Sequence, residues 1–242
     1  MDRPVLSVVI PAYNEAAAIR STVEAVDHYL AGLRTTHEII VVDDGSTDRT
    51  ADIVTSLIPA LPSVRLLSSR HQGKGGAVKQ GMLAARGEQL LFMDADHSTR
   101  IEGWSQLVPW LRDGYDVVIG SRKMAGASIQ VRQPPLREAM GKTFTWLSNV
   151  VLPIRVSDVT CGFKAFQAAA ARRIFPLQRI EGWGFDAEML FIARQMGCRI
   201  KEVPVVWRND RSTNVRLLRD AIHSLTELVQ IRGWAWQGRY RS

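Results

Sequence analysis

The first half of the chain alternates short apolar runs with amphipathic segments. The apolar runs are near-continuous, as expected of strands covered on both faces: they span residues 6–13, 38–44, 64–69, 89–96 and 115–122. Between them lie segments whose apolar residues recur at helical spacing, over residues 15–33, 50–58, 73–86 and 101–114. Strands that alternate with helices indicate a mostly parallel sheet with helices on both faces. The pattern therefore predicts an α/β fold.

The second half is less regular. Residues 122–138 are rich in Arg, Gln and Pro, and this composition predicts a loop. We expect a helix over residues 136–154 that Pro153 ends, a second helix over 185–197, a strand over 198–207 and a C-terminal helix from about residue 215. Since no repeat or low-complexity linker divides the 242 residues, we expect residues 1–242 to form a single domain.

Charge is distributed unevenly between the two halves. Residues 1–121 hold 11 basic and 15 acidic residues, a balance of −4, whereas residues 122–242 hold 20 and 9, a balance of +11. This asymmetry favours an anionic partner for the second half, and nucleic acid, an anionic membrane or a phosphorylated substrate all qualify. A soluble basic surface is the alternative.

Cysteine content and hydropathy exclude some protein classes. Cys161 and Cys198 are too few for a disulfide scaffold and share no CxxC spacing, so we expect reduced thiols in a cytosolic setting. The first 15 residues do not resemble a signal peptide, and no run approaches 18 apolar residues. We therefore expect no membrane-spanning helix.

Polar residues follow four of the predicted strands. Asn14 and Glu15 follow the first, Asp43-Asp44-Gly45-Ser46 the second, Asp94-Ala95-Asp96 the fourth, and Gly120-Ser121-Arg122 the fifth. In open parallel sheets, ligands bind at the carboxyl ends of the strands. Asp44 or Ser46 alone could instead cap the next helix, but four such clusters at one sheet edge favour a binding site.

A nicotinamide-dependent oxidoreductase is the obvious rival for such a sheet. It requires G-x-G-x-x-G after the first strand, where this chain has PAYNEAAAI, without glycine. The glycine-rich stretch HQGKGGAVKQG could present backbone N–H groups to an anion, but it follows the third strand and lacks the P-loop spacing. The oxidoreductase interpretation is therefore disfavoured.

Asp94 and Asp96 suggest a metal site. A turn at the end of a strand can bring two carboxylates that are two residues apart onto one ligand. Such hard oxygen donors suit Mg²⁺ or Mn²⁺, which bind through one or two carboxylates together with substrate phosphates. A divalent ion at this place would neutralise charge on a leaving diphosphate.

The ordered set of motifs resembles a known enzyme family. VVIPAYNE, EIIVVDDGSTDRT, GKGGAVKQGM, FMDADHST and VVIGSR are together similar to the family 2 inverting glycosyltransferases with the GT-A fold, over about the first 125 residues. VSDVTCGFKAF and GWGFDAEMLFIARQMGCRIKEVPVVW extend the resemblance to polyprenyl- and dolichyl-phosphate sugar synthases. The W-x-F-D-x-E phrase is closer to the glucosyl branch than to the mannosyl branch. DxD alone is a weak motif, whereas the ordered set is specific.

The resemblance implies roles for the first half, residues 1–121, in binding a sugar nucleotide. Asp94 and Asp96 would hold the divalent metal, with Asp96 the stronger ligand and a catalytic residue. His97 is more typical of a structural residue than of a ligand, and Ser98 stands where mannosyl relatives have Gln. The expected nucleotide-sugar site comprises Pro11, Ala12, Tyr13, Glu15, Asp43, Asp44, Lys74, Asp94, Ala95 and Asp96.

The second half, residues 122–242, would bind a lipid monophosphate. A phosphate monoester is largely dianionic near neutral pH, so no general base is expected. Arg122 and Arg137 are the candidates for gripping this phosphate and for catalysis, because Arg can donate two parallel hydrogen bonds. Asp158 and Asp186 would orient basic groups or sugar hydroxyls. Family members carry G-S-K before the last helix, where this chain has Asn214 in place of the Lys; Arg211 or Arg216 could supply the charge.

The resulting hypothesis is an inverting transfer of glucose from UDP-glucose to a polyprenyl phosphate at the cytoplasmic membrane face. Trp, Tyr and Arg residues within 146–152 and 231–240 suit peripheral contact with anionic headgroups, although a packed core would also explain the Trp residues. The nearest alternative is GDP-mannose as the donor. A non-catalytic nucleic-acid-binding protein is disfavoured, because the chain has no recognisable nucleic-acid motif.

Overall fold

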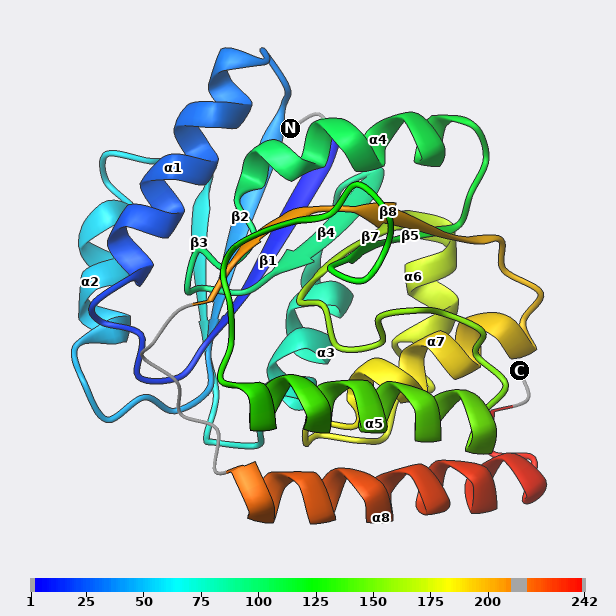
Figure 1. The fold of residues 1–242 in the computed structure, drawn as a ribbon. Coiled ribbons are helices and arrows are strands. Elements are labelled where there is room, and N and C mark those ends of the chain that lie inside the picture. Colours follow the sequence, from blue (N-terminus) through cyan, green and yellow to red (C-terminus); the bar gives the residue numbers. More distant parts are fainter. Residues whose placement is uncertain (1–2, 210–216, 241–242) are drawn as a thin grey trace.

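A seven-stranded sheet forms the centre of the protein (Figure 1). The computed structural model describes residues 3–209 and 217–240. The strand order is β3-β2-β1-β4-β7-β5-β8, and every neighbouring pair is parallel except those that involve β7. The strands span β1 Leu6–Ala12, β2 His37–Asp43, β3 Val64–Ser68, β4 Gln89–Met93, β5 Val117–Ser121, β7 Phe163–Gln167 and β8 Ile200–Pro204. The mostly parallel α/β sheet is confirmed.

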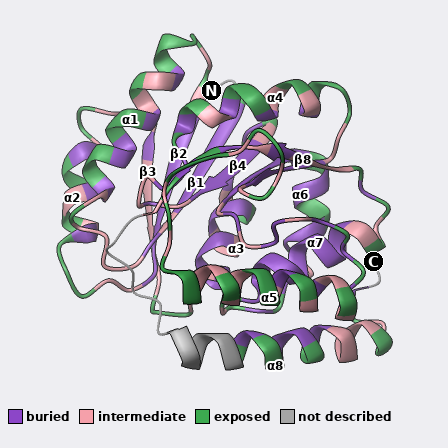
Figure 2. Ribbon diagram, viewed as in Figure 1, coloured by how far each residue is buried: buried purple, intermediate pink, exposed green. Residues whose placement is uncertain are grey.

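Helices cover both faces of this sheet, as predicted. One face packs against α1 (Ile19–Gly32), α2 (Thr50–Leu57), the 3₁₀ turn η1 (Ile101–Gly103) and α4 (Trp104–Arg112). The other packs against α3 (Lys74–Ala84), α6 (Ala168–Ile174) and α7 (Phe185–Gln195), and α8 (Leu217–Trp236) packs against α7. Because side chains alternate along a strand, the strands supply both cores, and Figure 2 shows the sheet buried between its helices.

The second half of the chain completes the sheet instead of forming a separate unit. Strand β7 lies between β4 and β5 and is antiparallel to both, with Phe163 paired to Met93. The sequence pattern did not predict this strand or helix α6. FKAFQ is only five residues long and carries Lys164, which is fully buried. Because a lysine interrupts the apolar run, the sequence does not indicate that this segment is a buried strand. Its place in the sheet is explained by the neighbouring strands and by the groups that bind the lysine.

Two further departures from the expected elements lie in the second half. The predicted loop contains β6 (Ser128–Val131), and the predicted strand over 198–207 is two strands, β8 and β9 (Val206–Arg208). Strands β6 and β9 pair in parallel as a separate small sheet. The loop interpretation was therefore wrong for residues 128–131, whose side chains are mostly exposed and show no apolar run.

Helices α5 (Pro135–Val151) and α8 lie side by side along one edge of the molecule (Figure 1). Their inner residues reach the core that contains α3 and α7, and include Ile231, which is fully buried. Their outer faces expose several large apolar side chains, namely Leu136, Trp146, Val150, Leu225, Val229 and Trp236. No helix among residues 3–209 and 217–240 has the length and hydropathy to cross a membrane.

Candidate functional site

The end of β4 places the two acidic side chains of the D-A-D motif. The N–H of Asp94 donates to the carbonyl of Gly162 (3.1 Å), and Oδ1 of Asp96 accepts the N–H of Ser98 (2.9 Å). The carbonyl of the intervening Ala95 accepts a hydrogen bond from Thr22 Oγ1 (2.6 Å). Asp94 and Ala95 are therefore held by distant segments of the chain, whereas the contact of Asp96 lies within the turn itself.

Gly162 leaves the space that the Asp94 carboxylate occupies. An added Cβ at this glycine would lie 2.0–2.4 Å from the three carboxylate atoms of Asp94. That separation is far below van der Waals contact, so only glycine leaves the carboxylate where it is. The sequence reasoning did not single out Gly162, because nothing in the local pattern around T-C-G-F shows which side chain approaches it.

The charges at this turn are strongly coupled. Lys74, the first residue of α3, places Nζ 2.6 Å from Oδ1 of Asp94. Burial raises the pKa of Asp96, and the neighbouring charge of Asp94 raises it further. Burial disfavours the charged form of Lys74 and acts to lower its pKa. The negative charges of Asp94, Asp186 and Asp96 have the larger effect, so the pKa of Lys74 is raised. The site thus holds more negative charge than one lysine balances, which favours an added cation.

The donors of this turn fit a hard divalent cation. Asp94 and Asp96 offer carboxylate oxygens. Among the residues that the structure describes, no third His, Cys, Asp or Glu side chain joins them in a cluster able to hold a metal by itself. Mg²⁺ and Mn²⁺ are often bound by one or two carboxylates, with substrate phosphates and water as the other ligands. This donor set therefore suits a metal that arrives with a diphosphate.

His97 and Ser98 have structural partners. His97 has a left-handed backbone (φ 56°), and its Nε2 lies 2.9 Å from Ser21 Oγ on α1. Ser98 is buried, and its carbonyl accepts the N–H of Arg208 at the end of β9 (2.9 Å). These contacts agree with the structural interpretation of His97.

The loops after β1 and β2 are tied together by Asn14. Its Oδ1 accepts the N–H groups of Thr47 (2.8 Å) and Asp48 (3.3 Å), and its own N–H donates to Ser46 Oγ (2.9 Å). Ser46 therefore does not cap α2; Asp48 accepts the N–H of Thr50 at the start of that helix instead (2.9 Å). The capping interpretation of Ser46 was wrong, and the two strand ends form one rigid edge.

Side chains predicted to bind the nucleoside lie along this edge. Tyr13 stacks on His71 with ring centroids 4.2 Å apart, which leaves an aromatic surface next to the loop before α3. Asp43 is buried and accepts the N–H of Ser46 (3.2 Å). The edge also includes Pro11, Ala12 and Glu15, whose N–H donates to Thr50 Oγ1 (2.9 Å). Their contact with a nucleoside stays a prediction.

Asp44 holds the loop before α3. Its two carboxylate oxygens accept the N–H groups of Gln72 and Gly73, each at 2.8 Å, and Oδ2 lies 2.7 Å from Nδ1 of His71. The capping interpretation of Asp44 was therefore also wrong, since these contacts are not at the start of α2. Its expected nucleoside contact remains a prediction.

The glycine-rich start of α3 is covered by another segment. The N–H groups of Gly75 (2.8 Å) and Gly76 (3.2 Å) donate to the carbonyl of Glu181. An anion at this helix start would have to displace that carbonyl. The structure therefore does not present these N–H groups to a ligand, contrary to the possibility raised by the sequence.

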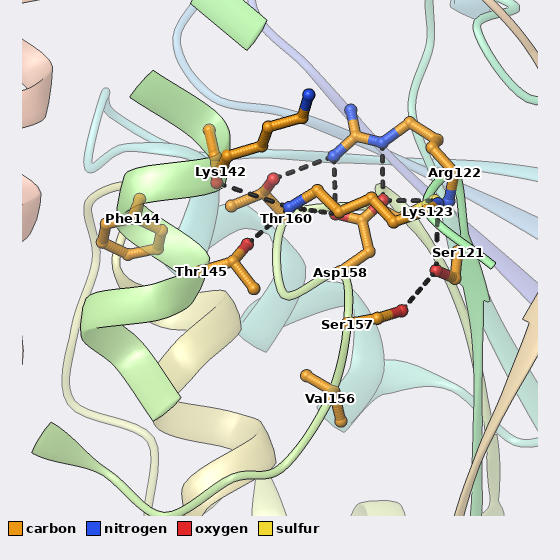
Figure 3. Close-up of polar contacts among 12 residues, drawn as sticks. Ser121, Arg122, Lys123, Lys142, Phe144, Thr145, Val156, Ser157, Asp158 and Thr160 are labelled. Carbon is orange, nitrogen blue, oxygen red and sulfur yellow. Dashed lines mark hydrogen bonds and ion pairs between the residues drawn. The ribbon is translucent and has the colours of Figure 1, made fainter. Parts of the chain in front are cut away.

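Arg122 is bound by Asp158 (Figure 3). Its Nε donates to Oδ2 (2.7 Å) and its Nη2 to Oδ1 (2.8 Å), while Nη2 also donates to Thr160 Oγ1 (2.9 Å). Asp158 is fully buried, and its N–H donates to Glu202 on β8 (3.2 Å). Asp158 thus orients Arg122, which agrees with the expectation that it orients a basic group. The Nε edge of the guanidinium is occupied, so a ligand phosphate would meet Nη1.

Two other basic residues lie near Arg122. Lys123 donates from Nζ to Thr145 Oγ1 of α5 (2.9 Å), and burial lowers its pKa. Arg137 lies near the start of α5, where burial lowers its pKa, the negative charge of Asp96 opposes that effect, and the charge of Arg122 adds to it. The structure therefore brings both predicted arginines into electrostatic range of each other, and Arg137 into range of the D-A-D turn.

Asp186 pairs with a buried lysine. Lys164 on β7 donates from Nζ to Oδ1 of Asp186 and to the carbonyl of Cys161. Burial raises the pKa of Asp186, and the charges of Lys164 and Lys74 oppose the rise. Lys164 was not singled out from the sequence, although a lysine within an apolar run is a recognisable signal. Cys161 and Cys198 are buried free thiols, and burial raises the pKa of Cys161 to about 12.

The candidates Arg211, Asn214 and Arg216 lie outside the residues that the structure describes. The replacement of a family lysine by Asn214 therefore stays a prediction.

The sequence profile described as Glycosyl transferase family 2 matches residues 7–175, which is more than half of the chain. The chain belongs to glycosyl transferase family 2. This match covers the D-A-D turn, Lys74 and the Arg122–Asp158 pair, whereas Asp186 lies beyond it.

Curated relatives extend the likeness over nearly the whole chain. Dolichyl-phosphate beta-glucosyltransferase ALG5C of Trichomonas vaginalis is 36% identical over 234 residues, which cover 92% of this chain and 69% of the relative. Dolichyl-phosphate beta-glucosyltransferase of Dictyostelium discoideum is 34% identical over 245 residues, which cover 96% of this chain and 75% of that one.

Solved structures show the same fold. Glucosyl-3-phosphoglycerate synthase of Mycobacterium tuberculosis, crystallised with Mn²⁺, UDP and glucosyl-3-phosphoglycerate, superposes with a TM-score of 0.70 at 22% identity. The comparison covers 95% of this chain and 80% of that one. The expected GT-A fold is thereby confirmed.

Proposed function

We propose that this protein transfers glucose from UDP-glucose to a polyprenyl phosphate with inversion. The observation that carries the proposal is the coupled D-A-D turn, in which Asp94 and Asp96 face Lys74 within a family 2 domain. The choice of glucose and of a lipid phosphate is supported by the relatives that are 34% and 36% identical, both of which are named dolichyl-phosphate beta-glucosyltransferases.

Different sets of residues would bind the sugar-nucleotide donor and the phosphate acceptor. The edge formed by Tyr13 and Asp43 would hold the nucleoside, and Asp94 and Asp96 would hold Mg²⁺ or Mn²⁺ with the diphosphate. When bound, such an ion neutralises charge on the departing nucleoside diphosphate. Lys74 is placed to contribute positive charge there as well, because its Nζ lies 2.6 Å from Asp94. Residues 1–121 would thus form the donor half of one domain.

The acceptor phosphate would meet the second half of the chain at Arg122 and Arg137. A phosphate oxygen forms the new bond to the anomeric carbon as the bond to the nucleoside diphosphate breaks. Since the second pKa of a phosphate monoester is about 6, the attacking oxygen is already ionised at neutral pH. The protein therefore has to orient the phosphate and balance its charge, and Asp158 prepares Arg122 for that task.

A sugar-nucleotide panel tests the donor. Purified protein with Mn²⁺ or Mg²⁺ and a short polyprenyl phosphate should form glycolipid from UDP-glucose, and UDP-glucose should raise the midpoint of thermal unfolding more than GDP-mannose. Chromatography of the lipid product and a thermal-shift assay measure the two effects. Product from GDP-mannose alone would establish the mannosyl alternative, and no product from any sugar nucleotide would refute the transferase proposal.

The outer faces of α5 and α8 would bring the enzyme to the lipid. Trp146 and Trp236 have exposed fractions of 64% and 78%, and the Arg232 guanidinium lies 5.3 Å from the ring centroid of Trp236. Exposed aromatic residues beside arginine suit an anionic membrane interface. Tyr240, which was expected to take part, is buried and donates to Glu188 (2.6 Å), so that expectation was wrong for this residue.

Sedimentation with vesicles tests this contact. The protein should pellet with vesicles containing anionic lipid at moderate salt, and the combined change Trp146→Ala and Trp236→Ala should weaken binding about tenfold or more, because each Trp buries a large apolar surface. Leu33→Ala, at an exposed residue just after α1, is the matched control and should leave binding unchanged. If wild-type protein stays in the supernatant, the peripheral-membrane proposal fails.

A further inference from the structure

The segment of residues 181–184 lies directly against the first turn of α3. The carbonyl of Glu181 accepts the N–H groups of Gly75 and Gly76, at 2.8 and 3.2 Å. Gly73, just before the helix, has φ +116°, and a Cβ there would lie 2.6 Å from the same carbonyl. No side chain can be added at Gly73 without moving one of the two segments, so their relative position is closely determined.

Trp183 connects this segment to the charges of the donor site. The ring of Trp183 is 37% exposed, and Lys74 Nζ lies 5.4 Å from its centroid, within the range of a cation–π contact. The same ammonium group lies 2.6 Å from Asp94. A shift of the segment would therefore change the surroundings of Lys74, and through Lys74 those of Asp94.

Glu227 supports the segment from the opposite side. It lies on α8, its exposed fraction is 4%, and its Oε2 accepts the N–H of Gly184 (2.7 Å). A Cβ at Gly182 would lie 2.3 Å from Oε1, and one at Gly184 would lie 2.7 Å from Oε2. The carboxylate thus fills the space that these two glycines leave. His223, one turn earlier on α8, lies 3.5 Å from Oε1.

We infer that Glu227 is a positioning residue for the sugar-nucleotide site. It holds residues 181–184 against the start of α3, so that Trp183 keeps Lys74 in the place from which Lys74 contributes positive charge at the diphosphate end of the donor. The inference rests on the proposed function of the site. Helix α8 would then have two roles. Glu227 supports residues 181–184, while the outer face, which exposes Leu225 and Val229, would contact the membrane.

Replacing Glu227 should weaken donor binding more than acceptor binding. Glu227→Ala removes the acceptor of the Gly184 N–H, and we expect it to weaken binding of UDP with Mn²⁺ about tenfold, since small displacements at a site cost this much or more. kcat/KM for UDP-glucose should fall by a similar factor, while KM for the polyprenyl phosphate changes less than about twofold. Glu227→Gln keeps an oxygen for the N–H and should restore most of the UDP affinity. Calorimetry and steady-state kinetics measure these effects.

A double-mutant cycle separates positioning from a general loss of stability. Gly182→Ala places a methyl group against the Glu227 carboxylate and should weaken UDP binding by itself; combined with Glu227→Ala it should add little, because the clash is gone. Thr226→Ala, at an exposed neighbour whose hydroxyl bonds within α8, is the matched control and should bind UDP like wild type. If Glu227→Ala does not fold, Gly182→Ala and Glu227→Gln still test whether Glu227 positions residues 181–184.

Two different failures can be told apart. If wild-type protein binds UDP and the Glu227 and Gly182 variants bind it equally well, the positioning role is refuted while the proposed function stands. If wild-type protein binds neither UDP nor any sugar nucleotide, the proposed function itself fails, and the positioning role fails with it.

Discussion

Asp96→Ala should reduce glycolipid formation by about 10³-fold or more while leaving the protein folded. If Asp96 holds the divalent ion of the proposed reaction, its loss removes several kcal/mol of charge stabilisation, and each 1.36 kcal/mol corresponds to a factor of ten. The midpoint of thermal unfolding should stay the same or rise. Burial and the neighbouring charge of Asp94 already raise the pKa of Asp96, so its ionised form is unfavourable without a cation.

Comparison with a surface acid makes this result specific. Asp52→Ala, at an exposed residue in the first turn of α2, changes the net charge equally and should retain wild-type turnover. Product formation and thermal unfolding are measured for both variants. An Asp96→Ala protein that is folded and keeps more than about a tenth of the wild-type rate would contradict the metal-binding role.

Asp158→Ala should lower the free energy of unfolding by about 3–5 kcal/mol, because it leaves the mostly buried guanidinium of Arg122 without its counter-charge. For a chain of this size, such a loss corresponds to a decrease of about 10 °C in the unfolding midpoint. Activity should fall as well, since Asp158 orients the arginine proposed to meet the acceptor phosphate. Urea denaturation and calorimetry measure the stability change.

The stabilisation by Asp158 should depend on pH in a defined direction. Burial opposes its ionisation, but hydrogen bonds and the charge of Arg122 outweigh burial and hold the pKa of Asp158 below its ordinary value. The contribution is therefore fully present above the unfolded-state pKa of about 3.9 and is lost as the pH falls through the lower, folded-state pKa. The difference between wild type and Asp158→Asn should be constant near neutral pH and should shrink in strong acid.

A nearby exposed pair serves as the stability control. Glu138 and Lys142 form an ion pair one turn apart on α5, at 2.6 Å, and both side chains are exposed. Glu138→Gln should leave the free energy of unfolding nearly unchanged, because an ion pair exposed to water contributes little to stability. If Asp158→Ala destabilises the protein no more than Glu138→Gln, the Arg122–Asp158 pair does not stabilise the fold.

The parallel part of the sheet and the place of the D-A-D turn could be predicted from the sequence. Residues 6–13, 38–44 and 89–96 combine a continuous apolar run with polar residues at the carboxyl end, and both signals are local. β7 could not be predicted in this way, because it is short and Lys164 interrupts its apolar run. Lysine is tolerated there only because Asp186 and the carbonyl of Cys161, which come from other segments, accept its hydrogen bonds.

Local sequence thus determined which strands form, where their carboxyl ends lie and which acidic residues follow them, because burial on both faces and strand-end polarity are properties of neighbouring residues. Tertiary structure decided what each polar group touches. Asp44 anchors the loop before α3, Asp158 occupies one edge of Arg122, and Gly162 leaves room for Asp94. These contacts join residues from distant parts of the chain, and no local pattern of hydrophobic and polar positions encodes a contact whose partner is elsewhere.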